Sequence, residues 1–322
     1  MAEASRARID DVRLNVIIAG ALLVAHGLAF SILPLWLVPT SAHWLWLLVP
    51  MVLLTTTHWA MIHEAIHGNL HHERRANDRL GRALAIVFGS PFDLLRFGHL
   101  SHHALNGSEP ERPDLYRPEQ GGLLMRIVYY VRLLIGLYAA ELLGTLVCLL
   151  PRRLLRPLVR WIFYDGDPEA QVMADRAERQ LLEPGRLART RVDAGLIVAL
   201  FGLTVWLYGA FWPALVLALL GRAFLVSFMD NAPHYGGEAG DRAQGFDLRA
   251  PRAISNLILN SNLHGTHHRH PNAPWRSLPD LFAADGSRFT GPYLTVPWRQ
   301  LRGPVPVAEG AKPTRRAGVK AG

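Results

Sequence analysis

Long apolar stretches alternate with short polar breaks along this chain. The first pair of stretches covers residues 14–38 and 44–62, and the second pair covers residues 194–210 and 211–229. Each stretch is nearly free of charge and is about as long as a helix that crosses a ~30 Å hydrocarbon core. The pattern therefore predicts an all-α, polytopic membrane protein with about four transmembrane helices arranged as two hairpins.

Polar segments follow each predicted hairpin, and they contain shorter apolar pieces. Residues 63–122 are rich in His and Arg, and their one apolar piece, 84–95, is too short to cross a bilayer, which predicts an interfacial or re-entrant segment. Residues 123–150 are long enough to cross, but three charged side chains within them and a basic cluster after them favour an interfacial helix or a hairpin in one leaflet. Residues 161–190 are charged and predict a helical connector.

The formal net charge of +8 comes almost entirely from arginines that flank the apolar stretches. Such a distribution follows the positive-inside rule and places both termini and the polar segments in the cytoplasm, in a bacterial-type inner membrane. The predicted outer loops are short and uncharged, which agrees with this orientation. No nucleic-acid-binding motif accompanies the positive charge, so we do not expect a nucleic-acid partner.

One folded domain is expected over residues 1–302. Residues 303–322 are rich in Gly, Pro and basic residues and predict a disordered tail. The single cysteine, Cys148, lies in an apolar run and excludes both a disulfide framework and a cysteine-bound iron–sulfur cluster.

Histidines form three clusters at helical spacing. They are His63-Glu-Ala-Ile-His67, His99-Leu-Ser-His102-His103 and His264-Gly-Thr-His267-His268, and His234 adds a further histidine just after the fourth apolar stretch. Residues three and four apart share one face of a helix, so each cluster directs several imidazoles to one side. Imidazole is a ligand for iron, copper, nickel and zinc.

The predicted topology brings these clusters to one side of the membrane. His63 follows the second stretch, His234 follows the fourth, and the other clusters lie in the polar segments on that side. A cytoplasmic cap rich in histidine is therefore expected, with four or five ligands for each of two metal ions. The nine candidate ligands are His63, His67, His99, His102, His103, His234, His264, His267 and His268.

Two other kinds of site remain open. His63–His67 also spells HExxH, the signature of zinc proteases, in which Glu64 would be the general base. That interpretation needs only one further ligand and leaves two clusters without a role. A bis-histidine haem carrier is a further alternative, but dense clusters at helical spacing argue against it.

The remaining histidines are expected outside the metal site. His26, His43 and His58 are expected to be solvated or interfacial, and His71, His72 and His270 fall outside the motif spacing and suit supporting or surface roles.

The three clusters resemble the HxxxH, HxxHH and HxxHH triple of the membrane fatty acid desaturase superfamily. Further matching text includes Arg96-Phe-Gly-His99 and the run from Asn262 to Trp275, Asn-Leu-His-Gly-Thr-His-His-Arg-His-Pro-Asn-Ala-Pro-Trp. The resemblance covers about residues 15–300, although only the histidine clusters are specific. It implies a stem of four spans beneath a cytoplasmic cap that holds two iron ions and uses O2 as co-substrate.

His234 matches a further ligand of that family. Several members carry Asn four residues before this histidine; here Asp230 occupies the position and Asn231 follows it, which leaves the supporting role open between the two. Glu64, Asp114 and Asn262 are also candidates to orient metal-bound imidazoles through the ring nitrogen that faces away from the ion.

The superfamily includes acyl-lipid desaturases, alkane hydroxylases and carotenoid ketolases and hydroxylases, and their ligand clusters do not distinguish these reactions. The text around the third cluster is more similar to acyl desaturases than to alkane hydroxylases, and an apolar slot beneath the metal ions suits a long acyl chain from the bilayer. The substrate predicted is therefore an acyl chain, with an alkane or a carotenoid as the alternative. Electrons must come from a separate protein similar to ferredoxin or rubredoxin, whose acidic surface suits the arginine-rich face.

Overall fold

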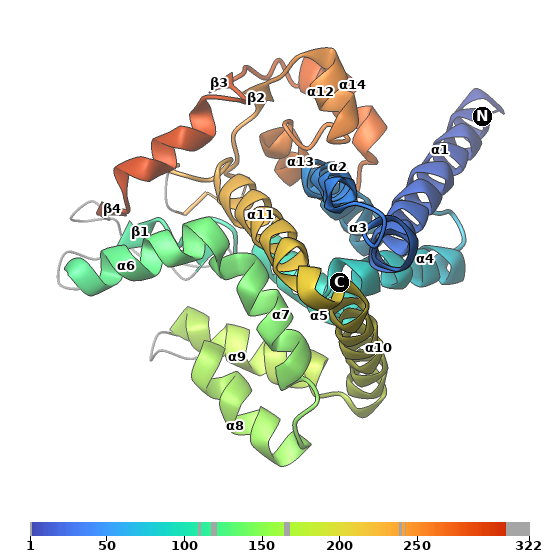
Figure 1. Ribbon diagram of the computed structural model, residues 1–322. Coiled ribbons are helices and arrows are strands. Elements are labelled where there is room, and N and C mark those ends of the chain that lie inside the picture. Colours follow the sequence, from blue (N-terminus) through green and yellow to red (C-terminus); the bar gives the residue numbers. More distant parts are fainter. Residues whose placement is uncertain are drawn as a thin grey trace.

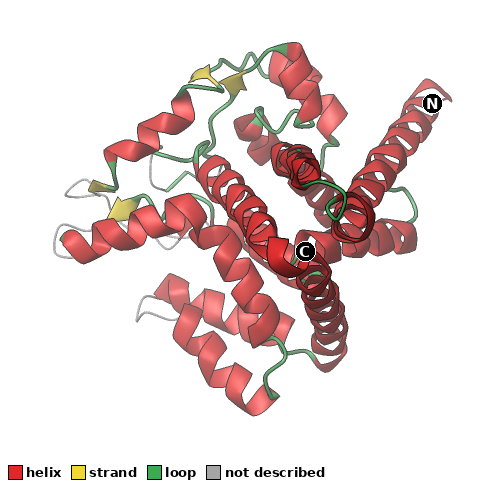
Figure 2. Cartoon of the chain, viewed as in Figure 1, coloured by secondary structure: helices red, strands yellow, loops and turns green. Residues whose placement is uncertain are grey.

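The structure is a computed structural model. It describes residues 2–108, 111–116, 121–163, 168–237, 240–241 and 243–306. Helices dominate these residues, and the four strands among them contain two residues each (Figure 2). The predicted all-α class is confirmed.

The first half of the predicted stem is a pair of interrupted helices. Helix α1 (Ala2–Gly27) continues into a π-helical segment, Leu28–Leu37, that contains Pro34. The chain then turns and returns through a 3₁₀ segment (Ala42–Leu47), α2 (Leu48–Leu53) and α3 (Thr55–His67). The return path bends by 42° at Leu54 and ends at the first histidine cluster.

Helices α4 (Arg74–Phe88) and α5 (Phe92–Leu105) form a tight hairpin against α3. Gly89 closes α4 with a φ of +108°, a conformation that favours glycine. The apolar side chains on both sides of this turn, Leu84, Phe88 and Phe92, are buried in the main hydrophobic core. Residues 84–95, predicted to be interfacial or re-entrant, thus pack inside the protein and place α5 beside α3.

A continuous helical stretch follows. It consists of α6 (Leu123–Val131), a π-helical turn (Arg132–Gly136) and α7 (Leu137–Val147). Helices α8 (Arg152–Phe163) and α9 (Pro168–Leu181) then form a pair that packs on α5. The predicted helical connector is confirmed over the length of α9.

The second half of the stem is formed by α10 (Pro184–Tyr208) and α11 (Trp212–Asn231), of 25 and 20 residues. Gly209, with a φ of +52°, ends α10 and begins a single 3₁₀ turn that leads into α11. The break lies where the sequence predicted the second hairpin turn. In Figure 1, α11 runs through the middle of the molecule, with α3 on one side and α7 on the other.

The C-terminal part wraps the cap end of α11 with short elements. They are β2 (Leu248–Arg249), α12 (Arg252–Leu257), α13 (His264–Arg269), a 3₁₀ turn (Trp275–Ser277), α14 (Leu278–Ala284), β3 (Gly291–Pro292), a 3₁₀ segment (Val296–Arg302) and β4 (Val305–Pro306). Strand β2 pairs in parallel with β3, and β4 pairs in parallel with β1 (Leu115–Tyr116).

The pairing of β4 extends the folded part four residues into the segment predicted as a tail. Residues 307–322 of that predicted tail lie outside the described residues.

Within the described ranges, three helical stretches are long and apolar enough to cross a membrane, and a fourth is added if the bent α2–α3 path counts as one span. The three are Asp11–Leu37, Leu123–Val147 and Pro184–Asn231.

Candidate metal centre

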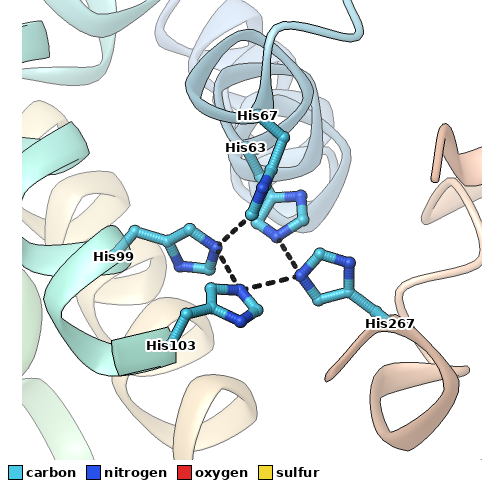
Figure 3. A group of neighbouring side chains, drawn as sticks. All are labelled: His63, His67, His99, His103 and His267. Carbon is cyan, nitrogen blue, oxygen red and sulfur yellow. Dashed lines mark hydrogen bonds between the residues drawn. The ribbon is translucent and has the colours of Figure 1, made fainter. Parts of the chain in front are cut away.

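Nine histidine side chains gather in two adjacent groups at the cap end of α3 and α11. The first group contains His63, His67, His99, His103 and His267, drawn in Figure 3. The second contains His102, His234, His264 and His268. Within each group, one ring nitrogen from every histidine lies within 4.8 Å of the others. All nine histidines predicted as ligands are in these groups.

Helical geometry explains how the motifs divide between the groups. Residues four apart lie on one face of a helix, so His99 and His103 of α5 enter the same group. His102 is rotated away from that face and enters the other group. In helix α13 the assignment to the groups is exchanged. His264 and His268, four residues apart, belong to the second group, and His267 belongs to the first. The two HxxHH motifs therefore link the groups.

The ring nitrogens of the first group approach one another closely. The Nε2–Nε2 distance is 2.8 Å between His67 and His99, and 3.0 Å for each of the pairs His63–His267, His99–His103 and His103–His267. Figure 3 shows the five rings converging from α3, α5 and α13.

The second group has the same geometry with four rings. The Nε2 atoms of His234 and His264 are 2.7 Å apart, and those of His264 and His268 are 2.9 Å apart. His102 approaches His268 at 3.3 Å. The ring centroids of His103 and His268 are 4.5 Å apart, so the two groups are immediate neighbours.

This arrangement fits two metal ions. Two imidazole nitrogens that bind one ion at about 2.1 Å, at roughly a right angle, lie about 3.0 Å apart. The observed distances of 2.7–3.3 Å agree with that spacing. Neither group includes a carboxylate or a thiolate among the described residues. A donor set made only of imidazoles suits a first-row transition metal rather than magnesium or calcium.

Burial holds several of the clustered histidines outside the candidate spans in the neutral form that binds metals. Burial lowers the pKa of His99, His234, His264 and His267 well below the usual value. Burial also lowers the pKa of His103, to about 3. A neutral imidazole offers a lone pair to an ion without first losing a proton.

Three polar side chains contact rings at Nδ1: Asn106 lies 3.2 Å from Nδ1 of His268, and two others accept a hydrogen bond from a ring. The Nδ1–H of His102 donates to the carboxylate of Glu111 (3.3 Å), and that of His234 donates to the side-chain oxygen of Gln244 (3.1 Å). Each contact directs Nε2 toward the group. Glu111 and Gln244 were not predicted from the sequence, because each lies in a loop without a spacing signal, nine or ten residues after the histidine that it contacts.

The five residues predicted to orient ligands lie near the site but make other contacts. Asp114 pairs with Arg112 and accepts from the Gly236 amide. The five predicted residues are Glu64, Asp114, Asp230, Asn231 and Asn262. Among the described residues, none of these five forms a hydrogen bond with a histidine ring of either group.

Three of these residues support the loops around the site instead. Asn231 donates to Gln300 and Asn262 donates to the Leu248 carbonyl. Glu64 accepts from the backbone amide of Trp275 at 3.3 Å, and its carboxylate is 3.8 Å from His63.

A buried carboxylate fixes the short helix α13. One oxygen of Asp247 accepts from the Thr266 amide (2.8 Å), and the other accepts from the Thr266 hydroxyl (3.0 Å) and the Arg269 guanidinium (3.2 Å). Gly265 allows the helix to approach the Gly245 carbonyl, because a Cβ at this position would overlap that oxygen. These contacts set the positions of His264, His267 and His268.

A cavity opens beside the histidines, between α3, α11 and the C-terminal elements. Its apolar lining includes Trp59, Leu225, Met229 and Leu259. Asp230 also lines this cavity. The cavity offers an apolar chain a place next to the two histidine groups.

The other histidines lie outside both groups. His26 and His58 are buried in the stem, contrary to the expected solvated or interfacial position. Their rings pack at 4.5 Å, and each ring contacts a backbone carbonyl, Leu22 for His26 and Leu84 for His58. His270 contacts Asp285 at the surface.

The HExxH alternative does not account for this geometry. His63 and His67 share their group with three further histidines, whereas a catalytic zinc site needs three protein ligands and an open position. Glu64 is buried and supports the Trp275 backbone.

The site and fold define a membrane protein built around clustered histidines, and the comparisons with known proteins agree. The chain belongs to the fatty acid desaturase family, which it matches over residues 39–299. It is also 24% identical over 284 residues to the beta-carotene ketolase of Paracoccus sp. (strain N81106 / MBIC 01143), which covers 84% of this chain and 93% of that protein. No solved structure was found to match it.

Membership of the superfamily, predicted from the histidine clusters, is confirmed. The chain is accordingly an integral membrane oxidoreductase.

Proposed function

We propose that this protein is an oxygen-dependent di-iron desaturase that introduces a C=C bond into the acyl chain of a lipid. The observation that carries the proposal is the pair of imidazole-only groups beside an apolar cavity. Two iron ions held there would supply O2 activation and removal of hydrogen from an unactivated carbon. For each double bond, O2, two electrons and two protons would be consumed and two water molecules formed.

The protein's own residues position the substrate and protect the reaction. Trp59, Leu225 and Met229 line the cavity and exclude water from the chain beside the histidines. Glu111 and Gln244 fix the rings of His102 and His234. The buried histidines remain neutral as ligands and contribute no negative charge to the ions.

The proposed topology is two membrane hairpins with both termini and the histidine-rich cap in the cytoplasm. The arginine flanks and the short uncharged loops between the paired helices support it. Both ends of the stretch 123–150 contact cap-side elements: Tyr129 donates to the Gln300 carbonyl, and Arg191 donates to the Leu150 carbonyl. These contacts favour an interfacial position for that stretch.

A separate electron-transfer protein, similar to ferredoxin or rubredoxin, would deliver the electrons. The chain has one cysteine and therefore cannot hold a cysteine-bound cluster of its own. An acidic donor would be attracted to the arginine-rich cap.

Oxygenation of a carotenoid is the second candidate function. The similarity to the Paracoccus beta-carotene ketolase over most of both chains favours it. Both reactions begin by removing hydrogen from an alkyl carbon, so the histidine groups serve either.

Product analysis distinguishes the two. The purified protein, loaded with iron and supplied with a competent donor, would receive acyl lipids, a linear alkane and a carotene in parallel, followed by mass spectrometry. We expect acyl chains that have lost two hydrogens. Oxygenated carotene or alkane with unchanged acyl chains would refute desaturation, but it would not contradict the assignment of the di-iron centre. His268→Ala serves as the inactive control.

A further inference from the structure

Helix α8 adjoins two of the candidate membrane spans. It begins at Arg152, a short turn after the candidate span Leu123–Val147 ends. Arg191 of α10 donates to the carbonyls of Cys148 (3.2 Å) and Leu150 (2.7 Å) in this turn. The turn is thereby tied to the first part of the span-forming stretch that starts at Pro184. The chain connection and these hydrogen bonds place the start of α8 beside the ends of two candidate spans.

The outer face of α8 is apolar and uncovered. Leu155 and Val159 are buried against α9 and α5. Leu154, Trp161 and Ile162 point away from that contact and are 50%, 78% and 53% exposed. A large exposed tryptophan beside leucine is typical of a helix in the headgroup region of a bilayer.

Four arginines flank this apolar face, and α8 contains no acidic residue. They are Arg152, Arg153, Arg156 and Arg160. Glu178 of α9 pairs with both Arg156 and Arg160. Among the described residues, Arg152 and Arg153 form no ion pair or side-chain hydrogen bond. The face therefore carries a net positive charge and includes two guanidinium groups without partners.

We propose that α8 is an interfacial helix that binds anionic phospholipid, with Arg152 and Arg153 on the headgroup phosphates and Leu154 and Trp161 among the upper acyl carbons. Charge alone would also suit an acidic protein. The lipid is favoured because the apolar side chains lie directly beside the arginines and continue the exposed apolar face of residues 123–150.

The position of α8 also connects this surface to the metal centre. Phe97 of α5 is buried against Leu155 and Val159, and its ring meets that of Phe163 at 5.8 Å. Phe97 precedes His99 by two residues. In addition, Arg176 of α9 donates to the Leu100 carbonyl (3.4 Å). Lipid that holds α8 and α9 in place thereby supports the helix carrying three of the nine histidines.

The test compares lipid binding by the full-length protein in detergent, measured by native mass spectrometry with phosphatidylglycerol or phosphatidylcholine. We expect wild type to prefer phosphatidylglycerol. The double substitution Arg152→Gln/Arg153→Gln should weaken phosphatidylglycerol binding by about 30-fold, the equivalent of about 1 kcal/mol for each arginine. Arg252→Gln/Arg288→Gln is the charge-matched control in the C-terminal part and should bind as wild type. No preference for the anionic lipid, or an equal loss in the control, would overturn the proposal.

A depth measurement separates lipid from protein as the partner. Because Cys148 is the sole cysteine, a spin label can be placed at position 154 in a Cys148→Ser/Leu154→Cys protein reconstituted in vesicles containing phosphatidylglycerol. We expect the label to be accessible to oxygen and shielded from a water-soluble nickel complex. A label fully accessible to nickel would show that α8 faces water and would refute the interfacial helix in favour of a soluble acidic partner.

Discussion

Individual histidines in this protein differ in which group they complete. His264 and His268 are one turn apart on α13 and serve the four-membered group, whereas His267 between them serves the five-membered group. A single substitution can therefore affect one ion more than the other. His270 lies two residues after His268 but contacts Asp285, which makes it a control just outside the motif.

Removing two ligands from the smaller group tests the two-ion interpretation. We expect close to two irons per chain and little zinc in the wild type, and about one iron per chain in His264→Ala/His268→Ala, since all five histidines of the other group remain. Metal analysis of purified protein measures this, and His270→Ala should retain both ions. One zinc and no iron in the wild type would contradict the assignment.

The contact between Glu111 and His102 allows a test of whether this carboxylate orients the His102 ring for metal binding. Glu111→Ala leaves the Nδ1–H of His102 without its acceptor, and losses of this kind weaken metal binding by about 10- to 100-fold. Titration with a competing chelator would measure the affinity. Glu73→Ala, at an exposed carboxylate near the first cluster, should leave it unchanged. Equal affinities for the Glu111 variant and wild type would show that the contact does not orient the ring.

At the scale of elements, the centre depends on where three helices meet. Helices α3, α5 and α13 each present ligands at helical spacing, but α13 has only six residues and is held by contacts outside itself. Asp247 caps its first turn, and Gly265 allows close approach to the backbone at Gly245. The shortest helix therefore relies most on tertiary contacts, since so short a helix is not stable alone.

Two glycines that each neighbour a ligand give a matched pair of substitutions. Gly265→Ala forces a methyl group against the Gly245 carbonyl, so we expect a loss of about 1–3 kcal/mol in stability and a lower iron content. Gly98→Ala has open space around its Cβ within α5 and should stabilise the protein by up to about 1 kcal/mol. Thermal unfolding and metal analysis measure both. Indistinguishable variants would show that α13 can shift freely.

For the whole molecule, the sequence predicted the helical class, the membrane character and the nine histidines, because their periodicity is local. It did not predict how the histidines divide, since that depends on the relative placement of α5 and α13. Glu111 and Gln244 were missed because loops, not spacing, bring them to the rings. Residues 84–95 were predicted to be interfacial or re-entrant, and their packing against α3 was not predicted, since an apolar sequence does not distinguish lipid from protein as its neighbour.

The buried histidines predict how the stability of the metal-free protein depends on pH. Burial lowers the pKa of His99, His264 and His267, so these groups stay neutral in the folded state while the unfolded chain binds protons below about pH 6.5. The unfolding free energy should therefore fall as the pH decreases from about 6.5, by up to about 1.4 kcal/mol per pH unit for each group. Unfolding temperatures of the metal-free protein at pH 8 and pH 5.5 would show it. A constant unfolding temperature would contradict the burial of these rings.

The proposed orientation can be tested because the native protein has one cysteine to remove. In a Cys148→Ser background, Thr40→Cys places a thiol in the turn between the first paired helices, and Glu73→Cys places one just after the first histidine cluster; both positions are exposed. If the arginine-flanked ends face the cytoplasm, a membrane-impermeant maleimide added to intact cells should label position 40 and not position 73. Inverted membrane vesicles should give the opposite result. Labelling of position 73 from outside would reverse the topology, and labelling of both positions from the same side would show that α1 and the α2–α3 path do not form a membrane-crossing hairpin.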